Sequence, residues 1–151
     1  MKTNILYVDD EIHNLNAFEA SYRRLFNVYT ADSAEKAILL LQKEDIHIII
    51  TDQRMPKMTG VQFLASILPT HPHPIRMILT AFSDVDAVID AINKGQVYRF
   101  IQKPWNEDNL RIDIEKAAEL YNLRKENREL TQKLVMANQQ LEFIARQNLL
   151  S

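Results

Sequence analysis

Three aspartates come directly after short apolar runs of this sequence, where they could form a site for a cation and a phosphoryl group. Asp9 and Asp10 follow the run from Asn4 to Val8, and Asp52 follows the run from His47 to Thr51. Clustered carboxylates raise one another's pKa unless a cation compensates their charge. Mg²⁺ is the expected cation, because it combines one or two carboxylates with phosphate oxygens. Asp52 is then a candidate nucleophile, since carboxylates form aspartyl-phosphate intermediates.

Two further polar residues stand at the ends of later apolar runs. Thr80 ends the run that begins at Ile75, and Lys103 follows the last run. A lysine ammonium supplies a compact positive charge to a phosphoryl oxygen, and the Thr80 hydroxyl can donate to another. The small side chain of Ala81 leaves room for the group.

The elements that must position these residues alternate along the chain. Expected strands cover residues 4–8, 28–31, 47–51, 75–80 and 97–101, and expected helices cover 12–26, 33–43, 61–68, 84–94 and a last helix from 107. This order predicts a doubly wound α/β fold: a five-stranded parallel sheet in the flavodoxin-like order 2-1-3-4-5. The carboxyl ends of the strands then meet at one edge, where the three aspartates, Thr80 and Lys103 converge.

Local signals mark several helix ends. Asp32 is expected to cap the second helix, with Glu35 completing a capping box. Leu25 is expected on the inner face of the first helix. Gly95 is expected to end the fourth helix, and Asn106 to cap the last one.

Composition narrows the function classes. Gly60 and Gly95 are the only glycines of the 151 residues, which excludes a glycine-rich phosphate loop, and there is no cysteine. The net charge of -2 argues against direct nucleic-acid binding. The apolar runs are too short to span a membrane, and no secretory segment precedes Asp9. The expected compartment is therefore the cytoplasm.

Four segments taken together resemble the receiver domain of bacterial two-component response regulators. They are "YVDDE", "ITDQRMPKMTG", "LTA" and "QKPW", and the resemblance covers residues 3 to 120. It implies that Asp52 accepts a phosphoryl group from a sensor histidine kinase or phosphotransfer protein. It also implies that Asp10, Asp52 and the backbone carbonyl of Arg54 ligate Mg²⁺ directly, while Asp9 acts mainly through water.

The resemblance further implies a set of switch residues. Thr80, followed by Ala81, moves toward the phosphoryl group, Lys103 pairs with that group, and Phe100 swings inward. Pro104 is expected to follow a cis peptide bond, as is usual in the family.

The resemblance also implies that two positions modulate hydrolysis of the aspartyl phosphate. Arg54 stands two residues after the acceptor, and Phe82 stands two residues after the threonine. Phe82 cannot hydrogen-bond an attacking water. We therefore expect a switch whose only chemistry is self-phosphorylation and slow self-dephosphorylation, not a turnover enzyme.

The last helical pattern continues past the receiver domain, assigned to residues 1–120, into an extension over 121–151. An a/d heptad seam predicts a parallel coiled-coil homodimer through residues 120–148, and its members are Leu120, Leu123, Asn127, Leu130, Leu134, Ala137, Leu141 and Ile144. Asn127 at an a position favours one register, and Glu119 can meet the partner's Arg124. The extension is expected to relay the switch to the dimer partner or to an output domain absent from these residues.

Other interpretations remain open. A Mg²⁺-dependent phosphohydrolase would need a second carboxylate two residues after Asp52, where Arg54 stands. A flavodoxin-like cofactor binder would need smaller residues in its loops. His71 and His73 are interpreted as parts of a surface turn, and Trp105 as a packing residue.

Overall fold

The computed structural model describes residues 2–150 except Gly95, and the main chain but not the side chain of Phe82. The chain divides into two compact units, Met1–Tyr121 and Asn122–Ser151. In chain order the elements are β1 (Asn4–Val8), α1 (Ile12–Tyr22), β2 (Asn27–Ala31), α2 (Ala34–Lys43), β3 (Ile48–Asp52), α3 (Gly60–Ile67), β4 (Ile75–Thr80), the 3₁₀ turn η1 (Phe82–Asp84), α4 (Val85–Asn93), β5 (Arg99–Gln102) and α5 (Glu107–Leu150).

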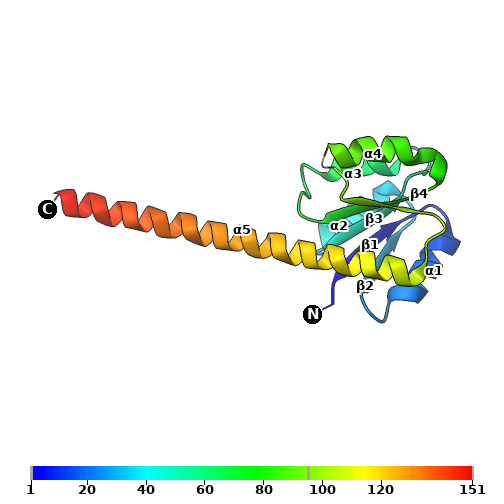
Figure 1. Cartoon of the computed structure of the whole chain (residues 1–151), viewed down its shortest axis with the longest axis horizontal. Helices are drawn as coiled ribbons and strands as arrows, with labels where there is room; N and C mark the ends of the chain where they lie inside the picture. Colours follow the sequence, from blue (N-terminus) through cyan, green and yellow to red (C-terminus); the bar gives the residue numbers. More distant parts are fainter. Residues whose placement is uncertain (1, 95, 151) are drawn as a thin grey trace. The chain divides into compact units, whose positions relative to one another are not determined.

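The first unit is built on a parallel sheet in the order β2-β1-β3-β4-β5, which confirms the predicted doubly wound fold (Figure 1). β1 pairs with both β2 and β3, so that Val8 lies opposite Ala31 on one side and Thr51 on the other. Asp52 lies opposite Leu79 of β4. The carboxyl ends of β1, β3 and β4 are therefore neighbours at one edge.

Alternate residues of each strand face opposite helical layers. Ile5 and Tyr7 of β1 pack with Phe18 of α1 and Ile114 of α5. Leu6 and Val8 face the other way, into a cluster with buried residues of α2, α3 and α4. All five residues of β3 are buried, because β3 lies in the middle of the sheet with helices on both faces.

Side chains cap three of the helices. Thr59 and Gln62 form a reciprocal capping box at the start of α3, and Asn106 Oδ1 accepts the amide of Asn109 in α5. The expected cap of α2 by Asp32 is wrong. Ser33 accepts the amide of Lys36 instead, and the Asp32 carboxylate lies 3.0 Å from the ammonium of Lys36.

Several predicted boundaries are also wrong. α1 ends at Tyr22, and the amides of Leu25 and Phe26 both donate to the Tyr22 carbonyl in a turn. Leu25 is consequently 48% exposed and does not face the core. β5 begins at Arg99 and not at the predicted residue 97, because its pairing with β4 starts with Arg99 opposite Met77. The expected helix end at Gly95 lies outside the described residues.

The part of α5 in the first unit packs with the face predicted for it: Leu110, Ile114, Ala117 and Tyr121 are buried. Leu120, the expected first residue of the seam, is partly buried against the same core. The uncovered seam therefore begins at Leu123.

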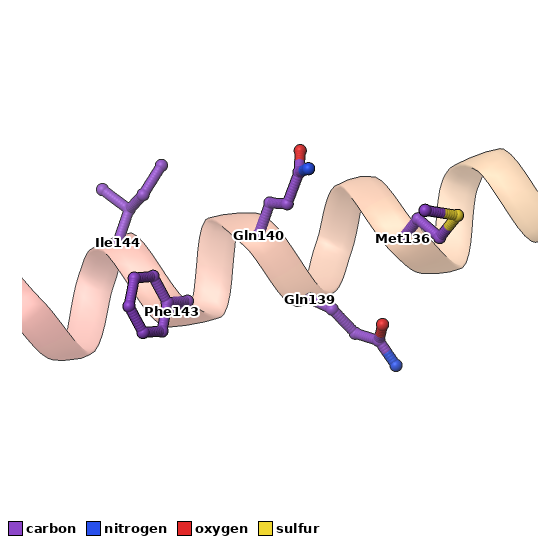
Figure 2. Close-up of a pocket in the computed structure, with 5 residues that line it drawn as sticks. All are labelled: Met136, Gln139, Gln140, Phe143 and Ile144. Atoms are coloured by element: carbon purple, nitrogen blue, oxygen red, sulfur yellow. The ribbon is translucent and has the colours of Figure 1, made fainter.

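The second unit is a single helical segment of α5, and its apolar seam residues are exposed. The larger seam residues Leu123, Leu130, Leu134, Leu141 and Ile144 are 54% to 65% exposed. Figure 2 shows Met136, Phe143 and Ile144 projecting from this helix, where with Gln139 and Gln140 they line a shallow hollow. Within the described residues, no helix combines the length and the apolar content that crossing a membrane requires.

Candidate functional site

The predicted carboxylates do converge at the carboxyl edge of the sheet. Asp9, Asp10 and Asp52 each offer one carboxylate oxygen, and these three oxygens lie within 4.8 Å of one another. Asp9 and Asp52 are buried, whereas Asp10 is exposed. In the described part of the chain, this is the one group of three or more potential metal-ligating side chains.

Asp9 is held in place by several donors. Its Oδ2 accepts from the Tyr7 hydroxyl at 2.7 Å and from the Asn14 amide at 3.0 Å. Its Oδ1 accepts from the backbone amide of Glu11 at 3.0 Å. Donors on both oxygens stabilise a charge that burial would otherwise disfavour. Tyr7 and Asn14 were not among the predicted site residues, because nothing in their spacing shows that they point at Asp9.

Lys103 supplies the positive charge inside the site. Its Nζ lies 3.0 Å from Asp52 Oδ1 and 3.5 Å from Asp9 Oδ2. The Lys103 backbone amide donates to the carbonyl of Thr80 at 2.9 Å, which ties the end of β5 to the end of β4. The peptide bond between Lys103 and Pro104 is cis, as expected.

Burial and the opposite charge of the partner have opposing effects on the pKa values of Asp52 and Lys103. Burial raises the pKa of Asp52, and the hydrogen bond and charge of Lys103 oppose this rise without cancelling it. Burial alone would lower the pKa of Lys103, but Asp52 and Asp9 outweigh it and the pKa is raised. The ammonium is therefore held charged, while the Asp52 carboxylate is less stable in its charged form than a carboxylate in water.

The loop after β3 fixes Asp52 from the other side. The backbone amide of Gln53 donates to Asp52 Oδ1 at 2.9 Å. The buried side chain of Gln53 accepts, through Oε1, a hydrogen bond from the backbone amide of Val61 at 3.0 Å. The amide of Gly60 donates to the Gln53 carbonyl at 2.9 Å. A Cβ at Gly60 would collide with the backbone carbonyl of Asp52, so this close approach requires glycine.

The predicted switch residues Thr80 and Phe100 lie on β4 and β5, the two neighbouring strands at one side of the sheet. Thr80 is fully buried, and its hydroxyl donates to the carbonyl of Ala81 at 3.2 Å. Phe100 is half-buried beside the cluster that contains Ile78 and Val88. Thr80 would therefore have to exchange its present bond in order to reach a group on Asp52.

The Arg54 side chain makes a contact that the sequence did not reveal. Its Nε donates to Asp84 Oδ2 at 2.8 Å, and its Nη2 donates to Asp84 Oδ1 at 3.2 Å and to Ser83 Oγ at 3.3 Å. The hydrogen bond and charge of Asp84 raise the pKa of Arg54, and Asp52 adds to this rise. Arg54 thus joins the loops that follow β3 and β4.

The remaining candidates have structural roles. Trp105 packs edge-on against Tyr7 and Phe18, which confirms its interpretation as a packing residue. His71 and His73 lie between α3 and β4, as predicted, and the Thr70 hydroxyl is 3.0 Å from His71 Nδ1.

The family model of the response regulator receiver domain matches residues 5–115. The chain therefore belongs to the receiver domains of response regulators, which are signalling modules rather than catalytic enzymes.

Individual relatives agree with this assignment. The chain is 38% identical over 122 residues to the hydrogenase transcriptional regulatory protein HoxA of Bradyrhizobium diazoefficiens, which covers 81% of this chain and 25% of HoxA. The chain thus spans about a quarter of the length of the curated relatives it matches.

Solved structures show the same fold. The crystal structure of adenylate cyclase from Rhodopirellula baltica has a TM-score of 0.85 and 30% identity, covering 88% of this chain and 99% of that one. A response regulator receiver domain protein from Clostridium thermocellum has a TM-score of 0.75 and 30% identity, covering 80% and 98%.

Proposed function

We propose that this chain is a phosphorylation-dependent switch in which Asp52 accepts a phosphoryl group from the phosphohistidine of a sensor histidine kinase or phosphotransfer protein. The observation that supports this most directly is the convergence of three carboxylates around a lysine. Lys103 Nζ lies 3.0 Å from Asp52 Oδ1, at the edge where the oxygens of Asp9, Asp10 and Asp52 come together. Family membership supports the same role.

The donor set fits Mg²⁺, because it consists of carboxylate oxygens with one exposed member, Asp10, open to solvent. We assign direct contacts to Asp10, Asp52 and the Arg54 carbonyl. We assign a water-mediated contact to Asp9, whose Oδ2 already accepts from Tyr7 and Asn14 and whose Oδ1 accepts from the Glu11 amide. Bound Mg²⁺ would neutralise negative charge on the carboxylates and on the phosphoryl oxygens.

The transfer itself needs one nucleophilic oxygen. Lys103 and the Gln53 amide both bind Asp52 Oδ1, so we assign the attack to Oδ2. The new Oδ2–P bond forms while the P–N bond of the donor's phosphohistidine breaks, and the imidazole leaves with the bonding electron pair and takes up a proton. Lys103 then stabilises the charge of the transferred group.

The phosphoryl group carries a charge of about -1.5 to -2, in place of the single charge of the Asp52 carboxylate. We propose that Thr80 gives up the Ala81 carbonyl for a phosphoryl oxygen and that Phe100 moves into the space beside Ile78. The change reaches the rest of the protein through α5, which runs from Glu107 to Leu150. The recipients are a second copy of the chain, through residues 120–148, and an output domain.

Loss of the phosphoryl group should be slow. Hydrolysis needs an activated water, and the position two residues after the acceptor offers the cation Arg54 instead of a carboxylate base. A half-life of only seconds would contradict this proposal.

The experiment is incubation with Mg²⁺ and acetyl phosphate, followed by intact-mass measurement. We expect one phosphoryl adduct in the wild type and none in Asp52→Asn. Asp45→Asn is the matched control, because its side chain is 80% exposed and lies at the opposite end of the sheet, beside His47. Sustained turnover of a phosphate ester would favour the phosphohydrolase interpretation instead.

A further inference from the structure

Arg54 forms a two-pronged bridge between the acceptor loop and the start of α4. Its guanidinium makes three hydrogen bonds, two to Asp84 and one to Ser83, over 2.8 to 3.3 Å. Arg54 follows the acceptor by two residues, whereas Ser83 and Asp84 follow Thr80 in the turn η1. The bridge therefore connects the loops that carry the two reactive parts of the proposed switch.

Asp84 occupies the N-cap position of α4, yet its side chain makes no capping hydrogen bond. Aspartate at this position ordinarily accepts the amide of the second or third helical residue. Here those residues are Asp86 and Ala87. The Asp84 carboxylate has both oxygens on Arg54 instead, and the backbone of Asp84 has φ -107° and ψ 8°, away from the extended conformation of a typical N-cap.

We propose that Asp84 exchanges partners when Asp52 is phosphorylated: Arg54 turns to the phosphoryl oxygens, and the released Asp84 carboxylate caps α4. The exchange rests on the proposed phosphorylation of Asp52. It assigns to Arg54 a positioning role, through its side chain, that is separate from the metal contact of its backbone carbonyl.

Charge and geometry favour this exchange. A phosphoryl group carries up to twice the charge of a carboxylate and accepts the planar guanidinium fork in the same bidentate manner. The Arg54 side chain is 73% exposed, so its pair with Asp84 is screened by water and easily displaced. Asp52 is already among the charges that act on Arg54, which places the guanidinium within electrostatic reach of the acceptor.

The exchange would give the switch a two-state element at the start of α4. In one state Asp84 binds Arg54 and the first amides of α4 lack a side-chain acceptor. In the other state Asp84 caps these amides, and the Arg54 bridge between the acceptor loop and the β4–α4 loop is broken. Both ends of this element respond to the same phosphoryl group, which is the physical basis of coupling between them.

Backbone amide hydrogen exchange at Asp86 and Ala87, measured by NMR on the full chain with Mg²⁺ before and after acetyl phosphate, tests the proposal. In the wild type we expect phosphorylation to slow this exchange about fivefold, the effect of gaining one N-cap. Arg54→Gln frees Asp84, so protection should be present before phosphorylation and should not increase. Asp84→Asn keeps a capping side chain without the charge, so it should behave like Arg54→Gln.

Asp84→Ala removes both the pair and the cap, so exchange should stay fast in both states. Lys94→Gln and Asp90→Asn are the matched controls, because they make the same charge changes in the separate pair near the end of α4 and should respond like the wild type.

Two results would overturn the exchange: an adduct on Asp52 without any change at Asp86 and Ala87, or Arg54→Gln responding like the wild type. Absence of an adduct in the wild type would overturn the proposed function as well, so the two failures are distinguishable.

Discussion

At the scale of single residues, burial disfavours the ionised form of Asp52, the proposed phosphoryl acceptor. Burial raises the pKa of Asp52, so its ionised form is less stable in the folded chain than in the unfolded chain. Without divalent cations and near neutral pH, we expect Asp52→Asn to unfold at a higher urea concentration than the wild type. The difference should narrow as the pH falls through the folded pKa, because the wild-type carboxyl then takes up a proton.

Urea unfolding followed by circular dichroism across this pH range measures the effect, with exposed Asp90→Asn as the control for loss of one charge. With Mg²⁺ present, the wild type should become more stable to urea than Asp52→Asn. Mg²⁺ at about 100 times its Kd adds about 2.7 kcal/mol to the unfolding free energy of the wild type. Unfolding curves that coincide at every pH would contradict the prediction.

Tyr7 offers a second residue-scale prediction, since its hydroxyl donates to buried Asp9 Oδ2 at 2.7 Å. Tyr7→Phe should cost about 1 to 3 kcal/mol of unfolding free energy. It should also weaken Mg²⁺ binding by about tenfold, because Asp9 loses a partner that orients it. Calorimetric titration with Mg²⁺ measures this change.

Tyr22→Phe is the control, because its hydroxyl donates to the Glu107 carbonyl at 2.8 Å in the same aromatic cluster, away from the carboxylates. It should lose stability with unchanged Mg²⁺ affinity. Equal effects of the two variants on Mg²⁺ would show that Asp9 orientation does not matter to the site.

At the scale of elements, the start of α3 depends on a close backbone approach at Gly60. Replacing a helical glycine by alanine ordinarily stabilises a helix by about 1 kcal/mol. Here the new Cβ would meet the Asp52 carbonyl, which is backbone and cannot rotate away. Gly60→Ala should therefore destabilise the protein by about 1–3 kcal/mol and slow phosphorylation by acetyl phosphate.

Thermal unfolding and intact-mass kinetics check both effects, with exposed Ser66→Ala as the control within α3. A Gly60→Ala variant as stable as the wild type would mean that the acceptor loop shifts without penalty.

The sequence predicted elements better than it predicted contacts. Apolar runs such as Ile48 to Ile50 identify buried strands, and their alternation with helices determines the sheet order and hence the meeting of Asp9 and Asp52. Periodicity did not show that the chain turns after Tyr22, because Leu25 continues the helical spacing. Nor did it choose between Asp32 and Ser33, two neighbouring residues that both cap helices well.

Contacts between side chains of different loops were harder to predict for a related reason. Arg54 and Asp84 are 30 residues apart, and only the folded positions of their two loops bring the side chains together. Both residues had other plausible assignments in the sequence, Arg54 as a metal contact through its carbonyl and Asp84 as the first residue of a helix. Side-chain direction, which decides between such roles, is not encoded in spacing.

At the scale of the whole molecule, the C-terminal part of the second unit has exposed apolar residues and little charge to solvate them. From Leu134 to Leu150 the charged side chains are Glu142 and Arg146, which pair with each other at 3.7 Å. An isolated helix gains no burial from such a surface, and single helices are marginal in water. In the proposed dimer, burial of the seam against a second copy would provide the stabilisation that the helix alone lacks.

Substitutions at two adjacent residues, one on the seam and one off it, can show which face of the helix forms the dimer interface. Leu134 occupies an a position and is 62% exposed in the single chain, whereas Val135 lies off the seam and is 49% exposed. If the parallel coiled coil forms, Leu134→Asn should raise the dimer Kd at least about tenfold, which corresponds to about 1.4 kcal/mol, and Val135→Asn should leave it unchanged. Sedimentation equilibrium over a range of concentrations measures both. Asn127→Leu should tighten association while admitting other oligomers, because the buried asparagine specifies register at a cost in stability. Equal Kd values for the Leu134 and Val135 variants would assign the interface to a different face of α5.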